Sequence, residues 1–337
     1  MRDAQGAGTR LSRRKLLACC ASTFAALALL STSSASAQAW PAKPIRVIVP
    51  FPPGGGLDFF ARTMAPRLQE NLGQQIVVEN RSGAGGMVGA DVVAKAAPDG
   101  YTLLLASSAE LTISQHLYPK MAYDAIKDFA PVSYAAHAAL LFSVHPSLPV
   151  KSLQELVAHA RANPGKLAFA SAGTGGSQHL AGEILKTAAK IDIVHVPYKG
   201  AGPAVIDMVG GQVQMGFTAL PSSIQHARAG RLRPIAVTSV KRSEAAPELP
   251  TFSELGYPGV DLVVWYAALF PARTPPEIVN KMSAELNRAV NSPDVKAKLL
   301  EQGVESIGTT PDQLAKFMQS ESARYGRIIR DTGAKPD

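Results

Sequence analysis

Two glycine-rich turns are the segments of this sequence best suited to bind a ligand. Each follows a short β-branched run and precedes a predicted helix: residues 49–58 read VPFPPGGGLD and residues 170–179 read ASAGTGGSQH. Glycines let the backbone approach a ligand closely, and a helix N-terminus offers unpaired N–H groups with about half a positive charge. Because one turn lies in each half of the chain, we predict two turns that bind a carboxylate or phosphate across a cleft.

Four side chains near these turns have two possible roles each. Asp58 opens a helix, where a carboxylate favours the helix dipole, although it could instead accept a hydrogen bond from a ligand. His179 could bond a loop carbonyl or touch the ligand. Tyr198 has the apolar face and polar tip of a cleft residue, and Lys199 could supply charge to an anion, although exposure to solvent is the default for lysine.

Motifs for other chemistries are absent from the sequence or incomplete. Residues 82–89 resemble a dinucleotide fingerprint, but Val88 stands where G-x-G-x-x-G needs glycine, so we interpret them as a tight helix-opening turn. Neither a P-loop nor G-x-S-x-G occurs. The seven histidines, at 116, 137, 145, 159, 179, 195 and 226, lack metal-ligand spacing. We therefore expect neither a metal nor a cofactor.

The N-terminus has the pattern of an export signal. Basic residues at 13–15 precede an apolar run to Leu30 and a small-residue stretch that ends at Ala37, so we predict cleavage after Ala37 and an exported protein. The pair Arg13-Arg14 leaves the Sec and twin-arginine routes both open. Cys19 follows Lys15 too closely for a lipoprotein signal.

Composition excludes several classes of protein. The 337 residues are 46% hydrophobic and 18% charged, enough for a large core of one or two domains. Loss of residues 1–37 removes both cysteines, five basic residues and one acidic residue, which leaves 300 residues and lowers the formal charge from +8 to about +4. Without a basic cluster, we expect no binding to nucleic acid. Without cysteines, the remaining chain has no disulfide framework.

Short β-branched runs alternate with helical stretches, which predicts an α/β protein with largely parallel sheets. The expected strands are residues 45–49, 76–79, 102–106, 167–170, 192–196, 214–218, 235–238 and 305–307, and the expected helices are 57–72 and 87–95 with others starting at 152, 274 and 310. The C-terminal helices are accompanied by only one weak strand, so we expect the tail to return to the first half of the chain. Trp265 and Tyr266 are interpreted as core or hinge residues.

Eight motifs, taken in their order and spacing, make the chain resemble one family. They are PFPPGGG at 50–56 with Asp58 and Ala61-Arg62, VENRSGAGG at 78–86, APDGYTLL at 97–104, GGSQHL at 175–180, VPYKG at 196–200, GQV at 211–213, Trp265-Tyr266 and Thr274-Pro275. With these residues the chain is similar to the Bug family, the extracytoplasmic solute-binding receptors of tripartite tricarboxylate transporters. The resemblance runs from Trp40 through the last helix.

The resemblance implies a two-domain α/β periplasmic-binding-protein fold of type II that closes on its ligand like a Venus flytrap. The implied division is a signal at 1–37, a first domain of 38–137 with 262–337, and a second domain of 138–261. It also implies that the two turns hold a carboxylate through backbone N–H groups, hydroxyls and water. The implied ligand-binding residues are Phe51, Pro53, Gly54, Gly55, Gly56, Asp58, Ser107, Ser108, Thr174, Gly175, Gly176, Ser177, His179, Tyr198, Lys199, Thr218 and Ala219.

One departure from the family pattern bears on the ligand. Relatives often carry an acidic or amide residue where this chain has Thr218 and Ala219. A plain carboxylate or an aromatic acid is therefore favoured over a ligand whose ammonium or hydroxyl group needs such a partner. The expected partners are a small organic acid and integral-membrane transporter subunits, and the receptor is expected to be monomeric and not an enzyme. A receptor that signals without transport and an exported enzyme using the same cleft remain alternatives.

Overall fold

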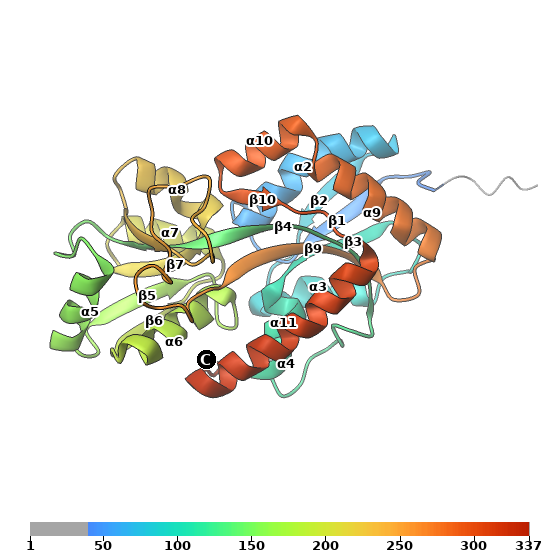
Figure 1. The fold of residues 1–337 in the computed structure, drawn as a ribbon. Coiled ribbons are helices and arrows are strands. Elements are labelled where there is room, and N and C mark those ends of the chain that lie inside the picture. Colours follow the sequence, from blue (N-terminus) through green and yellow to red (C-terminus); the bar gives the residue numbers. More distant parts are fainter. Residues whose placement is uncertain (1–39, 337) are drawn as a thin grey trace, which may run out of the picture. The chain divides into compact units, whose positions relative to one another are not determined.

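The computed structural model describes residues 40–336, and the chain from Lys43 onward forms one compact unit. The predicted export signal and its cleavage point lie outside the described residues. Within the described part, ten strands form a sheet whose main path runs β2-β1-β3-β9-β4-β7-β5-β6. Figure 1 shows β4 and β9 side by side through the middle of the molecule, with β1–β3 and β5–β7 on opposite sides of them.

The first half of the sheet is built from β1, β2 and β3, which run parallel, and from β9, which runs antiparallel to β3. These strands and the helices between them are β1 (Ile45–Val49), α2 (Gly56–Leu72), β2 (Ile76–Asn80), η1 (Ala84–Gly86), α3 (Met87–Ala94), β3 (Thr102–Ser107) and β9 (Val263–Pro271). After β3 come a π-helical turn, η2 (Ala109–Ile113), and the short helix α4 (Ser114–Leu117). Parallel strands joined by helices are the arrangement that the alternating pattern predicts. Among the described residues, however, five of the nine strand pairings are antiparallel, so the sheet is mixed and not largely parallel.

The second half repeats this design with β7, β5 and β6 in parallel. Its elements are α5 (Leu153–Ala162), β5 (Leu167–Ser171), α6 (Ser177–Ala189), β6 (Ile193–Pro197), α7 (Ala201–Val209), β7 (Met215–Ala219), α8 (Leu220–Arg228) and β8 (Arg233–Val237). In α6, Leu180, Ala181 and Leu185 are fully buried at helical spacing. Its apolar face therefore covers the strands β5, β6 and β7 of the sheet.

One long strand connects the two halves. β4 (Phe129–Val144) pairs with β9 through residues 129–139 and with β7 through residues 140–144, both antiparallel. The chain therefore passes into the second half along β4 and returns along β9. This change of partners lies beside the predicted boundary at 138, and the domain limits at 138 and 262 stay predictions.

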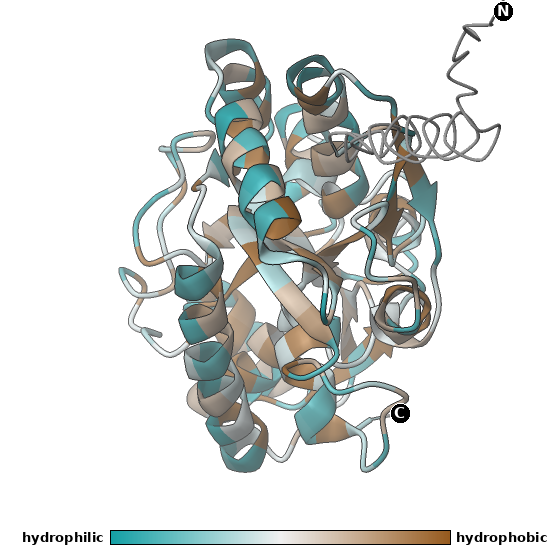
Figure 2. Cartoon of the chain, turned by 90° about the vertical axis from the view of Figure 1, so that its right-hand side faces the viewer, coloured by the Kyte–Doolittle hydropathy of each residue, from teal (hydrophilic) through white to brown (hydrophobic). Residues whose placement is uncertain are grey.

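The C-terminal elements are α9 (Pro276–Val290), α10 (Pro293–Glu301), β10 (Val304–Ser306) and α11 (Pro311–Thr332). α9 packs against β4 and α2, and β10 pairs with β4, so the tail returns to the first half as predicted. α11 packs against β4 and η2 but also reaches α6 of the second half. Figure 2 shows these helices with alternating hydrophilic and hydrophobic colours over largely hydrophobic strands.

The three helices expected to start at 152, 274 and 310 begin within two residues of these positions. Thr310 and Gln313 form a complete capping box at α11. At α5, Ser152 accepts a hydrogen bond from the N–H of Glu155, but the Glu155 carboxylate bonds the N–H of Lys151, so the box is only half formed. Pro275, not Thr274, occupies the N-cap of α9. Among the described helices, none combines the length and the apolar character that crossing a membrane requires.

Candidate functional site

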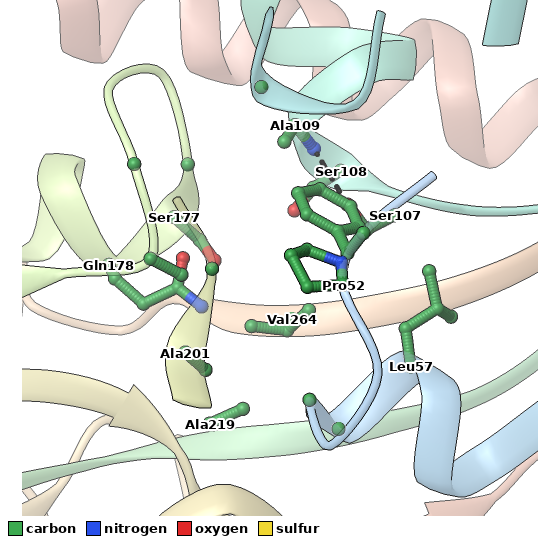
Figure 3. Close-up of a pocket in the computed structure, with 18 of the residues that line it drawn as sticks. Pro52, Leu57, Ser107, Ser108, Ala109, Ser177, Gln178, Ala201, Ala219 and Val264 are labelled. Atoms are coloured by element: carbon green, nitrogen blue, oxygen red, sulfur yellow. Dashed lines mark hydrogen bonds between the residues drawn. The ribbon is translucent and has the colours of Figure 1, made fainter. Parts of the chain in front are cut away.

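A narrow cleft, continuous with solvent, lies at the carboxyl ends of strands from both halves. Its lining residues are Phe51, Pro52, Gly55, Gly56, Leu57, Gly85, Ser107, Ser108, Ala109, Ala172, Gly173, Thr174, Gly176, Ser177, Gln178, Gly200, Ala201, Gly202, Ala219, Val264 and Tyr266. In open α/β sheets this edge is where ligands bind. Figure 3 shows Ser177 and Gln178 on one side of the cleft and Pro52, Ser107 and Ser108 on the other.

Both predicted glycine-rich turns reach this cleft. Gly55 is the N-cap residue of α2 and Gly176 is the N-cap residue of α6, and neither helix has a side-chain cap. The first N–H groups of two helices are therefore available in the cleft without a side chain that competes for them. None of the described residues that line the cleft carries a charge, so these N–H groups and dipoles dominate its electrostatics.

Two buried hydroxyl groups in the cleft lack hydrogen-bond partners among the described residues. Ser177 Oγ and Tyr266 Oη both fall in this group, and each residue is 1% exposed. A Cβ atom on Gly56 would lie 2.5 Å from Tyr266 Oη, which places this hydroxyl against the first turn of α2. Burial raises the pKa of Tyr266, so its hydroxyl keeps its proton and can donate it to an acceptor.

Asp58 holds the first turn in place from outside the cleft. Its carboxylate accepts hydrogen bonds from Gly54 N–H at 3.0 Å, from Arg62 Nε at 3.0 Å and from Asn80 Nδ2 at 2.9 Å. Burial would raise its pKa, yet the bonds from Arg62, Gly54 and Asn80 together lower it. Its oxygens are therefore engaged by neighbouring residues of the protein, and its role toward a ligand stays a prediction.

His179 supports the second turn in a similar way. Gly175 N–H donates to His179 Nδ1 at 3.3 Å, and the imidazole stacks on His195 with ring centroids 4.0 Å apart. Neither His179 nor Gly175 lines the cleft. Gly175 has a φ of +80°, and a Cβ there would lie 3.0 Å from Leu117 Cδ1, so the turn itself requires glycine.

Tyr198 and Lys199 line a neighbouring hollow that shares Phe51, Thr174 and other walls with the cleft. Tyr198 donates its hydroxyl proton to Asp207 Oδ2 at 2.9 Å. Burial, followed by this contact, raises the pKa of Tyr198 to about 12. Lys199 is the one charged residue among the described residues that line this hollow.

The remaining predicted residues divide between cleft and framework. Phe51, Gly55, Gly56, Ser107, Ser108, Thr174, Gly176, Ser177 and Ala219 line the cleft, whereas Pro53, Gly54 and Thr218 line neither hollow. Thr218 donates its hydroxyl proton to Ser223 Oγ at 2.6 Å, inside the second half.

The sequence profile of the tripartite tricarboxylate transporter family receptors matches residues 60–334. The chain belongs to this family. BugT of Bordetella pertussis, a relative of this receptor, is 43% identical over 303 residues, which cover 89% of this chain and 92% of BugT. The family resemblance drawn from the motifs is thus confirmed.

Two solved structures show the same fold as this receptor. The periplasmic binding protein BugD is 30% identical, with a TM-score of 0.84 over 88% of this chain and all of that one. The R. palustris protein Rpa4515, solved with adipate, is 36% identical, with a TM-score of 0.86 over 88% of this chain and all of that one. The predicted α/β periplasmic-binding-protein fold is therefore confirmed.

Several cleft residues of this receptor were missed by sequence reasoning. Tyr266 is buried, as its interpretation as a core residue predicts, but that interpretation did not foresee that it also lines the cleft. Gln178 follows Ser177 in the first turn of α6, so its position in a predicted turn could have indicated it. Val264 lies on β9, and only the pairing of β9 with β4 brings it to the cleft.

Proposed function

We propose that this receptor captures a small carboxylate-bearing metabolite in the cleft and delivers it to the membrane subunits of a tripartite transporter, without catalysing a reaction. The observation that carries the proposal is the uncharged cleft in which two uncapped helix N-termini meet two buried, unpartnered hydroxyl groups. These groups are all hydrogen-bond donors, and a carboxylate offers about four acceptor sites.

The energetics favour an anion over a neutral ligand. A buried hydroxyl without a partner costs roughly 1–3 kcal/mol, and a ligand oxygen in reach of Ser177 or Tyr266 removes that cost. Each helix N-terminus adds a favourable interaction with negative charge of about 0.3–1 kcal/mol or more. The relative solved with adipate supports a carboxylic acid as the ligand class.

We propose direct or water-mediated ligand contacts for the nine predicted residues that line the cleft. Tyr198 and Lys199 would contact only the part of a longer ligand that extends into the neighbouring hollow. Asp58, Gly54, His179 and Gly175 act through the shape of the turns. Pro53 and Thr218, which line neither hollow, are proposed to act only through neighbouring residues.

The proposed mechanism is closure of the two halves about β4 and β9. A ligand favours the closed state when only that state lets both turns reach it. The proposal includes a monomer in the periplasm, with 38–137 and 262–337 as one domain and 138–261 as the other, after cleavage at Ala37 by the Sec or the twin-arginine route.

A thermal-shift screen tests this function. The panel contains adipate, malate, succinate, citrate, benzoate, nicotinate and glutamate, with glucose and a tripeptide as non-acid controls. A ligand at a hundredfold excess over its dissociation constant should stabilise the protein by about 2.7 kcal/mol. A shift with only the sugar or the peptide would contradict carboxylate binding, and chemical conversion of a bound acid would show an enzyme.

A further inference from the structure

A buried glutamate lies directly behind the cleft wall. Glu110 is 0% exposed and belongs to the π-helical turn η2, immediately after the cleft residues Ser107, Ser108 and Ala109. A Cβ atom on Gly86 would lie 3.1 Å from Glu110 Oε2 and 3.1 Å from the Phe51 ring, which places the carboxyl group under the first turn. π-helical turns of this kind are frequent at functional sites.

Among the described residues, the carboxylate of Glu110 receives hydrogen bonds from Ser107 and from its own backbone N–H. Ser107 N–H donates to Oε1 at 2.6 Å, and Ser107 Oγ donates to Oε2 at 2.7 Å. Within residues 40–336, no lysine, arginine or histidine forms an ion pair with it. A buried charge without a cation is costly, so the neutral acid is favoured.

The titratable groups on surrounding elements do not change this balance. They are Tyr123, whose hydroxyl donates to the Glu110 backbone oxygen at 2.6 Å, and Asp91 of α3, His116 of α4, and Glu321, Arg324 and Tyr325 of α11. Burial raises the pKa of Glu110 to about 7, and the hydrogen bonds from Ser107 oppose this rise only in part.

The Ser107 hydroxyl cannot serve Glu110 and a ligand at once. It has one proton to donate, and its oxygen already accepts a hydrogen bond from Ala109 N–H at 3.3 Å. While Glu110 is ionised, this proton points away from the cleft. When Glu110 is protonated, the acid donates to Ser107 Oγ, and the serine proton becomes available to a ligand carboxylate.

We propose that Glu110 is a positioning residue that couples ligand binding to the uptake of one proton through Ser107. The inference rests on the proposed carboxylate binding. On binding, the Ser107 O–H bond turns from Glu110 to the ligand oxygen, and the Glu110 carboxylate takes a proton from solvent and donates it to Ser107 Oγ. No covalent bond to the ligand forms, and the buffer supplies the proton.

The sign of the pH dependence follows from this exchange. A monocarboxylic acid such as benzoate has a pKa of about 4 and stays ionised from pH 6 to 9, whereas the last carboxyl group of citrate titrates within this range, so citrate is left out of the pH series. Below about pH 7 Glu110 already carries its proton and binding is strongest. Above that, affinity should fall by up to about tenfold per pH unit until the pKa of Glu110 in the complex is reached.

Calorimetry with the acids of the panel above, citrate excepted, tests the coupling from pH 6 to 9. Titrations of the wild-type protein in phosphate and in Tris give the number of protons taken up per ligand, which we expect to approach one near pH 8 and zero at pH 6. Glu110→Gln can accept from Ser107 N–H and donate to Ser107 Oγ, as the protonated acid does. We expect this variant to bind with the pH 6 wild-type affinity at every pH and without proton uptake.

Two further variants test whether the pH dependence of binding comes from Glu110 and Ser107 or from the titration of histidines. Ser107→Ala should bind more weakly and lose the pH dependence, because the shared hydroxyl is gone. Glu285→Gln changes a half-buried glutamate of α9 that pairs with Arg288, and it should keep the wild-type profile. If Glu110→Gln does not fold, wild-type proton uptake and Ser107→Ala decide the question.

The outcomes distinguish this coupling from the receptor function. Binding without proton uptake, or an unchanged pH slope in Glu110→Gln or Ser107→Ala, overturns the coupling and leaves the receptor function standing. If no acid of the panel binds at any pH, the proposed function fails, and this inference falls with it.

Discussion

Gly55 and Gly175, one in each turn, are glycine for different physical reasons. Gly55 has extended dihedral angles, φ −82° and ψ 167°, and a Cβ there would meet only Pro52 O, at 3.8 Å. Gly175, in contrast, has a φ of +80°, which side chains rarely adopt. The backbone therefore tolerates a larger residue at 55, where the space belongs to the cleft, but not at 175.

Substitution of Gly55 tests the role of the cleft directly. Gly55→Val should keep the fold and the unfolding midpoint but abolish ligand-induced stabilisation, because the side chain occupies the space in front of the α2 N-terminus. Gly259→Val is the matched control, since a Cβ there would make only an ordinary 3.7 Å contact with Ile184 outside the cleft. Thermal shift with the panel acids measures both variants, and normal binding by Gly55→Val would contradict the two-turn site.

At the scale of elements, the helix α11 contacts both halves of the molecule. It packs against β4 and η2 in the first half and against α6 in the second. Its N-terminus is closed by a capping box, in which Thr310 Oγ1 accepts from Gln313 N–H at 3.3 Å and Gln313 Oε1 accepts from Thr310 N–H at 2.9 Å. The start of a helix that supports both halves therefore depends on one threonine side chain.

Loss of this cap should lower stability by a predictable amount. Thr310→Ala removes the oxygen that accepts from Gln313 N–H, so we expect the free energy of unfolding to fall by about 1 kcal/mol. Urea denaturation followed by circular dichroism measures the change. Thr310→Ser retains the hydroxyl and should stay within a few tenths of a kcal/mol of the wild type. Equal losses in both variants would show that the hydroxyl bond is not the cause.

For the molecule as a whole, two paired strands carry the connection between the halves. β4 and β9 pair over residues 129–139 and 263–271, and each half of the sheet continues outward from them. The cleft takes walls from both halves, so a rotation about these strands changes the distance between the two turns.

Ligand-induced closure is the expected behaviour at this scale. Small-angle scattering should record a smaller radius of gyration when a binding acid is added at saturation, because the two turns approach each other around it. Gly55→Val with the same acid serves as the control and should show no change. An unchanged radius in the wild-type protein with proven binding would show that the cleft is already closed in the absence of ligand.

Much of the fold and half of the site could be predicted from sequence because they depend on local patterns. The alternation of strands and helices, the two glycine-rich turns and the Thr310 cap are all set by neighbouring residues. The 16 residues of β4 were not predicted. The strand changes its partner along its length, and its buried residues therefore follow no single alternating pattern. Tyr266 was placed in the core, since no local pattern distinguishes a buried ring from one whose hydroxyl meets a cleft.

By itself, the sequence determined the family, the α/β class and the two turns that meet at the cleft, because spacing along the chain is enough for each of these. Only the tertiary structure decided which side chains are still free to bind. Asp58 and His179 are occupied by neighbouring residues, whereas Ser177 and Tyr266 lack partners within the described part of the chain. Asp58 and His179 each combine a partner four residues away with a more distant one, Asn80 and His195, and only the folded chain brings these distant partners into contact.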